Sequence, residues 1–355
     1  MASTVALGLP SARVSGSQRP DRPDLVDRFG RVATDLRVSV TDRCNLRCTY
    51  CMPSEGLDWM AGEELLSTAE MNRLIAIAVT HLGIREVRFT GGEPLLRRDL
   101  AAIIKGTSAL TPRPDISMTT NGVGLAHRAA ALASAGLDRI NVSLDSSDRA
   151  AYAAITRRDY LPKVMDGLRA AAQAGIAPIK INAVLMRGVN EHHACDLLRL
   201  CMELDYELRF IEQMPLDSDD AWSATDMVTA SETLAILRAA FTLNPDAGTR
   251  GSAPAELWTV DDTHHRVGII ASVTQPFCGD CDRVRLTADG AIRSCLFAAE
   301  ETDLRALLRA NPSGERGDTL IADRWRDALW RKQPGHGIND TGFLHPTRPM
   351  SAIGG

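Results

Sequence analysis

The sequence contains no run of about 18 apolar residues, so a transmembrane helix is not expected. Its first residues also lack the charged start and the apolar core of a secretory signal peptide. The formal net charge of −5 gives the chain no general attraction to nucleic acid. We therefore expect a cytoplasmic protein with no membrane and no nucleic-acid partner, in which any site for an anionic ligand is built locally.

What the sequence does contain is a regular alternation of strand-like and helix-like segments. Six strands are expected at 35–41, 84–90, 115–120, 138–144, 178–186 and 206–212. The helix-like segments between them are 67–81, 98–105, 126–135, 161–174 and 191–204. Such alternation is typical of parallel βαβ units. Because no clear seventh or eighth unit follows, the predicted fold is α/β, an incomplete (β/α)6 TIM-type barrel that is open on one side.

The parts of the chain on either side of this pattern differ from it. Residues 1–31 are rich in Ser, Pro, Gly and Arg without periodicity, and we expect a mobile leader there. A short organelle-targeting segment is the alternative, because no acidic residue precedes Asp21. The barrel core is then 32–215. The C-terminal region, 216–355, has shorter strand-like and helix-like runs and is predicted to close the open side of the barrel.

Polar residues recur two positions apart within five of the expected strands. They are Arg37, Ser39 and Thr41; Arg88 and Thr90; Ser117 and Thr119; Asn141 and Ser143; and Lys180 and Asn182. A period of two places each set on one face of its strand, and apolar neighbours such as Val38 and Phe89 on the other. The polar faces cannot all be solvated edges of the sheet, because five strands carry them and helices are expected to cover such a sheet. We therefore predict a polar, basic cavity inside the barrel.

Six of the eight cysteines fall in two tight clusters, a pattern of metal binding in a reducing compartment. Cys44, Cys48 and Cys51 have the spacing C-x3-C-x2-C directly after the first expected strand. Thiolates suit iron–sulfur clusters and zinc. Three cysteines on a cubane of four irons would leave one iron open to a small molecule, whereas zinc would need a fourth ligand and no His lies nearby. An open-iron cluster is therefore predicted.

The second cysteine trio is Cys278, Cys281 and Cys295. A second cluster with one open iron is the economical interpretation beside the first. Zinc is the alternative, with Asp280, His264 or His265 as its fourth ligand. Arg283 and Arg285 alternate on one strand face between these cysteines, which suits them to grip an anion.

The loop Gly91-Gly92-Glu93-Pro94 follows the second expected strand, where glycines let the backbone approach a ligand closely. Together with the C-x3-C-x2-C motif, this loop resembles the radical S-adenosylmethionine (SAM) superfamily. In that superfamily the methionine part of SAM chelates the open iron, and the reduced cluster cleaves SAM to give a 5′-deoxyadenosyl radical. Segments 40–45, 88–94, 119–122, 141–145 and 209–212, the second cysteine trio and the final Gly354-Gly355 further resemble the GTP 3′,8-cyclase family of molybdenum cofactor biosynthesis.

The resemblance assigns roles residue by residue. Cys44, Cys48 and Cys51 would hold one 4Fe-4S cluster, and Cys278, Cys281 and Cys295 a second one whose open iron meets the guanine. The implied SAM contacts are Tyr50, Gly92, Ser143 and Met214. The implied GTP contacts are Arg37, Arg88, Thr119, Lys180, Arg283, Val284 and Arg285. Catalytic roles are implied for Arg283, Arg285, Gly354 and Gly355.

In the implied reaction, the 3′ hydrogen of GTP is removed and C3′ bonds to C8 of guanine. An electron and a proton complete (8S)-3′,8-cyclo-7,8-dihydroguanosine 5′-triphosphate, in the first step of molybdenum cofactor biosynthesis. The implied partners are GTP as substrate, an electron donor such as flavodoxin or ferredoxin, and the cyclic pyranopterin monophosphate synthase that takes the product, with a homodimer as one option.

Two alternative interpretations belong to other functional classes. A peptide-modifying radical enzyme with an auxiliary cluster would carry more C-terminal cysteines than the three found here. An iron–sulfur sensor or electron carrier would not explain the polar cavity or the Gly-Gly-Glu-Pro loop.

Overall fold

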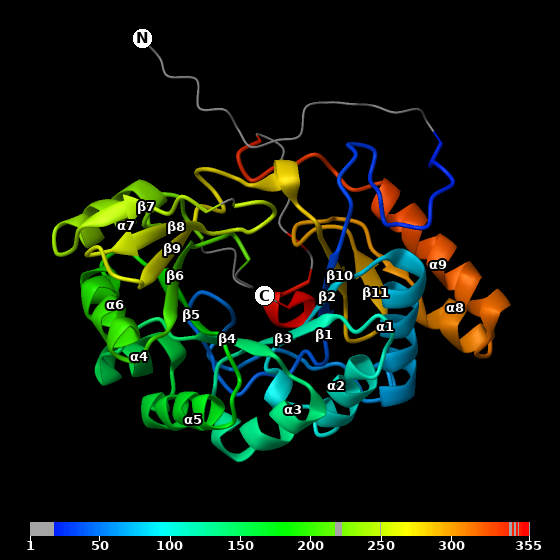
Figure 1. Ribbon diagram of the computed structural model, residues 1–355, viewed down its shortest axis with the longest axis horizontal. Coiled ribbons are helices and arrows are strands. Elements are labelled where there is room, and N and C mark those ends of the chain that lie inside the picture. The colour runs from blue at the N-terminus through cyan, green and yellow to red at the C-terminus, as the bar shows by residue number, and fades with distance from the viewer. Residues whose placement is uncertain are drawn as a thin grey trace, which may run out of the picture.

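Six parallel strands form the centre of a mixed α/β fold in the computed structural model, which describes residues 18–216, 222–248, 250–340, 343, 346 and 348–354 (Figure 1). The strands are β1 (Asp35–Ser39), β2 (Glu86–Thr90), β3 (Asp115–Thr120), β4 (Arg139–Ser143), β5 (Ile179–Leu185) and β6 (Glu207–Glu212). They pair in sequence order, each parallel to its neighbour. All six predicted strands are therefore present, with ends within two residues of those expected.

Helices lie around the outside of these strands (Figure 1). They are α1 (Thr68–Leu82), α2 (Leu100–Ser108), α3 (Ala129–Ala135), α4 (Arg149–Thr156), α5 (Leu161–Gln173) and α6 (Ala194–Glu203). Helix α1 begins at a capping box, in which Ser67 and Glu70 each accept a hydrogen bond from the other's backbone N–H. Helix α4 was not predicted; it is a short helix whose start is capped by Asp148, which accepts from Ala151 N at 2.8 Å.

The C-terminal strands extend the sheet on both sides. They are β7 (Leu243–Pro245), β8 (Glu256–Val260), β9 (Arg266–Ile270), β10 (Arg283–Leu286), β11 (Ala291–Arg293) and β12 (Thr302–Asp303). Over the described residues the strand order is β12-β11-β10-β1-β2-β3-β4-β5-β6-β9-β8-β7, so β10 pairs parallel with β1 and β9 with β6.

Two predictions about this part of the chain are therefore wrong. The C-terminal region does not close the sheet, which ends at β12 and β7 in the described part of the chain. Parallel neighbours also exist beyond the predicted six strands, on both edges. The sequence did not reveal them because β9 and β10 come from antiparallel hairpins with β8 and β11, which carry no βα pattern.

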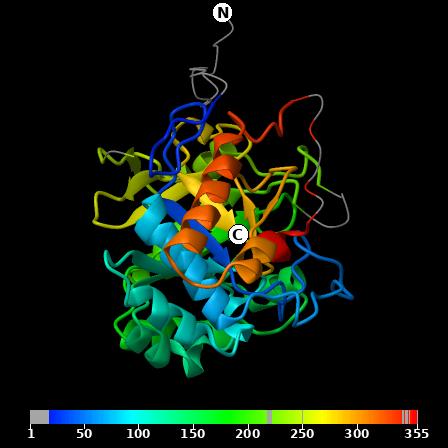
Figure 2. The ribbon, with the colours of Figure 1, turned by 90° about the vertical axis from the view of Figure 1, so that its right-hand side faces the viewer.

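The remaining helices are α7 (Ala230–Arg238), α8 (Arg305–Ala310), α9 (Glu315–Trp330) and α10 (Met350–Ile353). Helix α9 packs beside α1 at the edge of the molecule, as Figures 1 and 2 show from two sides. Short α10, drawn in red, lies at the centre of the curved sheet in Figure 1. Among the helices of the described residues, none is long and apolar enough to cross a membrane.

The predicted leader, 1–31, extends too far into the chain. Residues 1–17 lie outside the described residues. Leu25 is fully buried, and Nε of Arg31 forms a buried ion pair with Asp27 at 2.5 Å. Arg31 also donates to the backbone oxygen of Cys278 at 2.8 Å. The packed structure therefore includes residues from Leu25 onward, and Arg31 anchors this segment on the C-terminal region.

Candidate active site

One cavity of about 300 Å³ collects residues from both cysteine trios. Cys51 lines it from the first trio, and Cys278, Cys281 and Cys295 from the second. The arginines in its wall are Arg37, Arg88, Arg209, Arg283 and Arg285. The other predicted site residues in its wall are Tyr50, Thr119, Ser143 and Met214. The alternating neighbours Val38, Val87 and Phe89 are instead fully buried in the apolar core, so the predicted polar inner face is present.

The first trio, Cys44, Cys48 and Cys51, lies in the loop after β1. The backbone N–H of Cys51 donates to the oxygen of Cys48 at 3.0 Å, and Nδ2 of Asn121 donates to Sγ of Cys44 at 3.8 Å. Burial raises the pKa of the Cys44 thiol to about 11 and that of Cys51 to about 12. These thiols therefore keep their protons at neutral pH. They become thiolates only when a bound metal cation displaces the protons.

Tyr50 is held at the cavity wall by a buried carboxylate. Its hydroxyl donates to Oδ2 of Asp145 at 2.8 Å, and the backbone N–H of Val184 donates to Oδ1 of the same residue at 2.9 Å. Burial raises the pKa of Asp145 to about 6. The phenol ring is thereby fixed beside Cys51, where a flat heterocycle could stack on it.

Gly91 and Gly92 bring the loop after β2 against the loop after β1. The N–H of Gly92 donates to Thr41 O at 2.9 Å, and that of Glu93 to Arg43 O at 2.7 Å. A Cβ on Gly91, which has a φ of 139°, would lie 2.3 Å from Thr41 O, and one on Gly92 would lie 2.3 Å from Arg43 O. Only glycine therefore allows this contact, which braces the cysteine loop.

In the second trio, Cys278 begins the short turn η4 (Cys278–Asp280), and Cys281 directly follows this turn. Cys295 lies just after the end of β11. Burial raises the pKa of the Cys278 thiol to about 11. Burial also opposes ionisation of Cys281, but Lys332 and Arg283 outweigh it and lower the pKa of this thiol to about 6. This trio thus contains one thiol whose surroundings already favour the thiolate.

The spacing of the sulfurs tests whether either trio fits zinc. Thiolates on one zinc lie about 3.8 Å apart, given Zn–S bonds of about 2.3 Å. Among the residues that the structure describes, neither trio brings its three sulfurs within 4.8 Å of one another. Thiols that bind different irons of one cluster must lie farther apart than ligands of a single ion. Neither trio therefore has the compact sulfur spacing of a single zinc site in this structure.

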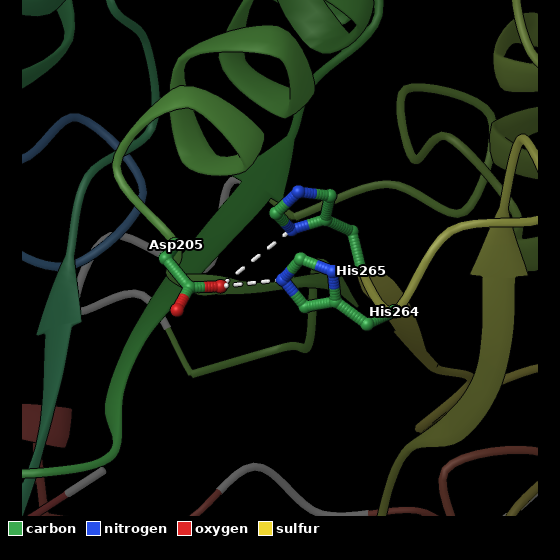
Figure 3. Close-up of side chains that lie close together, drawn as sticks. All are labelled: Asp205, His264 and His265. Carbon is green, nitrogen blue, oxygen red and sulfur yellow. Dashed lines mark hydrogen bonds and ion pairs between the residues drawn. The ribbon is translucent and has the colours of Figure 1, made fainter.

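The histidines that the zinc alternative would recruit lie elsewhere, in the turn between β8 and β9 (Figure 3). Nε2 of His264 is 3.1 Å, and Nδ1 of His265 is 3.7 Å, from Oδ1 of Asp205. Asp205 and His264 are exposed, and none of the three residues lines the cavity. Asp280 is exposed as well. The zinc alternative with either histidine as fourth ligand is therefore wrong.

The sheet register places three arginines side by side. Arg37 of β1 is the direct partner of Arg285 of β10 and of Arg88 of β2. Burial, with the charge of Arg88, lowers the pKa of Arg37 to about 10, and burial, with the charge of Arg37, lowers that of Arg285 to about 9. Asp35 supplies one carboxylate, 3.6 Å from Nη2 of Arg37.

Arg283 of β10 also belongs to this arginine cluster, because it lines the same cavity wall, and some donors of the cluster have no acceptor among the described residues. Within the described residues, Nε of Arg37 and Nη2 of Arg283 are buried without a hydrogen-bond partner. Buried like charges with unused donors are costly unless a ligand satisfies them. A polyanion such as a triphosphate would supply both the charge and the acceptors.

The end of the chain reaches the same arginines. The hydroxyl of Ser39 donates to Ile353 O at 2.8 Å, and Nη1 of Arg285 donates to Gly354 O. Gly354 has a φ of 81°, and a Cβ there would lie 2.5 Å from Oγ of Ser39. Gly355, the other predicted tail residue, lies outside the described residues.

Several predicted site residues lie outside the cavity wall. They are Cys44, Cys48, Gly92, Lys180, Val284 and Gly354. Nζ of Lys180 is 3.1 Å from Oε1 of Glu207, so its charge is already paired. Val284 is fully buried in the apolar core, on the strand face opposite Arg283 and Arg285. Any contact of Val284 with a ligand therefore comes from its backbone.

The wall also contains residues that sequence reasoning did not select as a site. Arg209 could have been found, because it continues the period-two polar pattern on β6 as the register partner of Asn182. His336 carried no such signal, since it lies in a loop after α9. Its Nδ1 accepts from Ile338 N at 3.1 Å, so Nε2 donates to Ser272 O at 2.9 Å.

Comparison with known proteins places these features in a family. Residues 38–201 match the radical SAM superfamily, and residues 206–338 match Molybdenum Cofactor Synthesis C. The chain is 58% identical over 349 residues to the GTP 3′,8-cyclase of Mycobacterium sp. (strain KMS), covering 98% of this chain and 99% of the relative. It is 57% identical over 363 residues to the GTP 3′,8-cyclase of Mycobacterium marinum (strain ATCC BAA-535 / M), covering 99% and 100%.

A solved structure shares the fold at low sequence identity. Streptococcus suis SuiB bound to S-adenosylmethionine is 13% identical, with a TM-score of 0.56, and the match covers 88% of this chain and 69% of SuiB. The chain therefore belongs to the radical SAM superfamily and, within it, to the family of its GTP 3′,8-cyclase relatives.

Proposed function

We propose that this protein is a GTP 3′,8-cyclase that forms (8S)-3′,8-cyclo-7,8-dihydroguanosine 5′-triphosphate, the first step of molybdenum cofactor biosynthesis. The observation that carries the proposal is the single cavity in which Cys51, the arginine cluster and the second cysteine trio meet. Relatives of nearly the same length bear this enzyme name, and they support the proposal. We also infer that the curve of β1–β6 around the cavity is that of a partial barrel, which leaves room for a large substrate.

Cys44, Cys48 and Cys51 would hold the 4Fe-4S cluster that binds SAM. Together, the reduced cluster and SAM supply a 5′-deoxyadenosyl radical when bound. Tyr50, Ser143 and Met214 line the adjoining cavity wall and would contact SAM. Gly92, in the loop after β2, packs against the cysteine loop and braces it.

Cys278, Cys281 and Cys295 would hold a second 4Fe-4S cluster, with an open iron that faces the guanine. Two observations support this assignment: the three sulfurs do not all lie within 4.8 Å of one another, as ligands of one zinc ion would, and the surroundings of Cys281 favour the thiolate. Because these cysteines and Cys51 line one cavity, a nucleotide held by the second trio would lie within the space that the first trio also borders.

The arginine cluster would bind the triphosphate. Arg37, Arg88, Arg283 and Arg285 offer planar, paired donors that match phosphate oxygens, and Thr119 adds a hydroxyl. Lys180 would join them only after exchanging Glu207 for phosphate. Binding a polyanion such as GTP would relieve the mutual repulsion of these buried cations.

The protein's main contribution to the reaction is alignment. The ribose of GTP loses its 3′ hydrogen, C3′ bonds to C8 of guanine, and one electron and one proton then complete the cyclic product. C3′ and C8 belong to one molecule, so the site has to hold the ribose and the base in a single productive orientation. Arg283, Arg285 and the Gly354-Gly355 tail would fix this orientation, because Gly354 already accepts a hydrogen bond from Arg285.

Further partners follow from this chemistry. The reduction of the cluster requires an external one-electron donor such as flavodoxin or ferredoxin. A cyclic pyranopterin monophosphate synthase would consume the product. We also keep a homodimer as a proposed assembly, to be measured by the mass of the reconstituted protein in solution.

The proposed function is tested with protein whose clusters are reconstituted anaerobically. With a reductant, SAM and GTP, we expect equal amounts of 5′-deoxyadenosine and of a cyclised product with the mass of GTP. ATP in place of GTP should leave SAM cleavage slow and uncoupled. Cleavage of SAM with GTP recovered unchanged would contradict the cyclase proposal.

A further inference from the structure

A buried lysine, Lys332, lies directly against the second cysteine trio. It follows α9 and is only 3% exposed. Its Nζ lies 3.3 Å from Sγ of Cys281, 3.2 Å from the oxygen of Cys281 and 2.8 Å from the oxygen of Arg283, and donates to all three. An ammonium group has three donors, so every one of them is used within this short segment.

The charge of Lys332 has no carboxylate partner among the residues that the structure describes. In the described part of the chain, no Asp or Glu oxygen lies within 4.0 Å of its Nζ, and two of its three acceptors are neutral backbone oxygens. A buried cation is costly unless an anion compensates it. The sulfur of Cys281 is the acceptor that can carry a negative charge, either as a thiolate or as a ligand of a cluster.

Arg31 provides a direct comparison at the other end of the same turn. It donates to the backbone oxygen of Cys278 at 2.8 Å and to that of Gln333 at 2.6 Å. The charge of Arg31, however, is compensated by Asp27 at 2.5 Å. Arg31 therefore anchors the turn through backbone oxygens, whereas Lys332 both anchors the turn and donates to the sulfur of Cys281, with no carboxylate partner in the described part of the chain.

We propose that Lys332 is a positioning residue that holds the Cys281 sulfur in place and raises the reduction potential of the second cluster. The inference rests on the proposed function, because it assumes that Cys281 is a cluster ligand. Reduction adds negative charge to a cluster, so a nearby cation and an N–H···S hydrogen bond stabilise the reduced form more than the oxidised one. A purely structural lysine would anchor the turn but would leave the potential unchanged.

The test uses the full-length chain with Cys44, Cys48 and Cys51 replaced by Ala, so that only the second cluster can form. On this background we compare Lys332→Met, Lys332→Arg and Gln333→Met by iron content and by a redox titration followed by electron paramagnetic resonance. Gln333 is the matched control, because it is the next residue, is exposed and donates to Arg331 O rather than to a sulfur.

We expect Lys332→Met to shift the one-electron equilibrium at least tenfold toward the oxidised cluster, a potential about 59 mV lower. Lys332→Arg should recover most of this shift, and Gln333→Met should match the background. Loss of iron from Lys332→Met alone would support only the positioning of the sulfur, because a purely structural lysine would give the same result. An unchanged potential in Lys332→Met, or iron loss in Gln333→Met as well, would overturn it.

These outcomes are separate from a failure of the proposed function. If the protein with the three cysteine substitutions binds no iron, the assignment of a second cluster is wrong, and so is the proposed cyclase site. If the background binds about four irons and Lys332→Met does not change the potential, only the role of Lys332 is wrong.

Discussion

Replacing Arg285 with Met should stabilise the substrate-free protein while it weakens GTP binding. The pKa of Arg285 is lowered from 12.5 to about 9, by burial and by Arg37, and at neutral pH this corresponds to a cost of about 5 kcal/mol for the charged side chain. The substitution removes this cost but also removes the hydrogen bond to Gly354 O, which contributes about 1–3 kcal/mol. The expected net gain is about 2–4 kcal/mol, or an increase in Tm of a few degrees.

The stability advantage of the variant should shrink when GTP is present. GTP at 100 times its Kd stabilises the native protein by about 2.7 kcal/mol. Loss of charge-assisted hydrogen bonds from Arg285 should weaken binding by about 1.5–3 kcal/mol, so the same GTP concentration should stabilise the variant by only about 0.3–1.3 kcal/mol. Anaerobic thermal unfolding of cluster-loaded protein, with and without GTP, measures both effects.

Arg293→Met is the matched control for this experiment. Arg293 is the register partner of Arg285 on β11 and is equally buried, but it is paired with Glu301 and does not line the cavity. Its replacement should therefore lower Tm and leave the GTP-induced increase intact. If Arg285→Met also lowered Tm and kept the full response to GTP, the arginine cluster would be a structural feature and not a phosphate site.

Three other substitutions test separate parts of the account. Cys295→Ala should lower bound iron from about eight to about four per chain and keep SAM cleavage, yet abolish GTP conversion; unchanged conversion would refute the second cluster. Gly354→Val would place a side chain against Thr90, so we expect at least a tenfold loss of cyclised product while SAM cleavage is retained. A normal yield of product would exclude the C-terminal tail from the site. Burial opposes ionisation of Asp35, but Arg37 and its neighbours outweigh it and hold its pKa below 3.8. The stability that this carboxylate contributes is thus present above about pH 4 and is lost as the pH falls through the folded-state pKa, and acid unfolding of Asp35→Asn should lack that dependence.

The central strands and the polar face of the cavity were predictable because their signals are local. Each strand carries its own alternation, and alternation alone separates Arg37, Arg88 and Ser143 from Val38 and Phe89. The side-by-side placement of Arg37 and Arg88 could not be predicted in the same way, since it depends on the register between strands rather than on the pattern within one.

The C-terminal half was harder to predict because its contacts are distant in sequence. The pairing of β10 with β1 joins residues such as Arg285 and Arg37, and nothing near either residue encodes it. Lys332 illustrates the same limit: a single lysine after a helix carries no pattern, and only the fold reveals that it reaches Cys281.

The most direct measurement of the central claim follows the 3′ hydrogen of the substrate. GTP deuterated at C3′ is incubated anaerobically with reconstituted protein, reductant and unlabelled SAM, and the 5′-deoxyadenosine is analysed by mass spectrometry. If the cavity aligns the ribose with the radical as proposed, one deuterium should appear in 5′-deoxyadenosine for each cyclised product formed. Unlabelled 5′-deoxyadenosine, with deuterium retained in the nucleotide, would contradict the account.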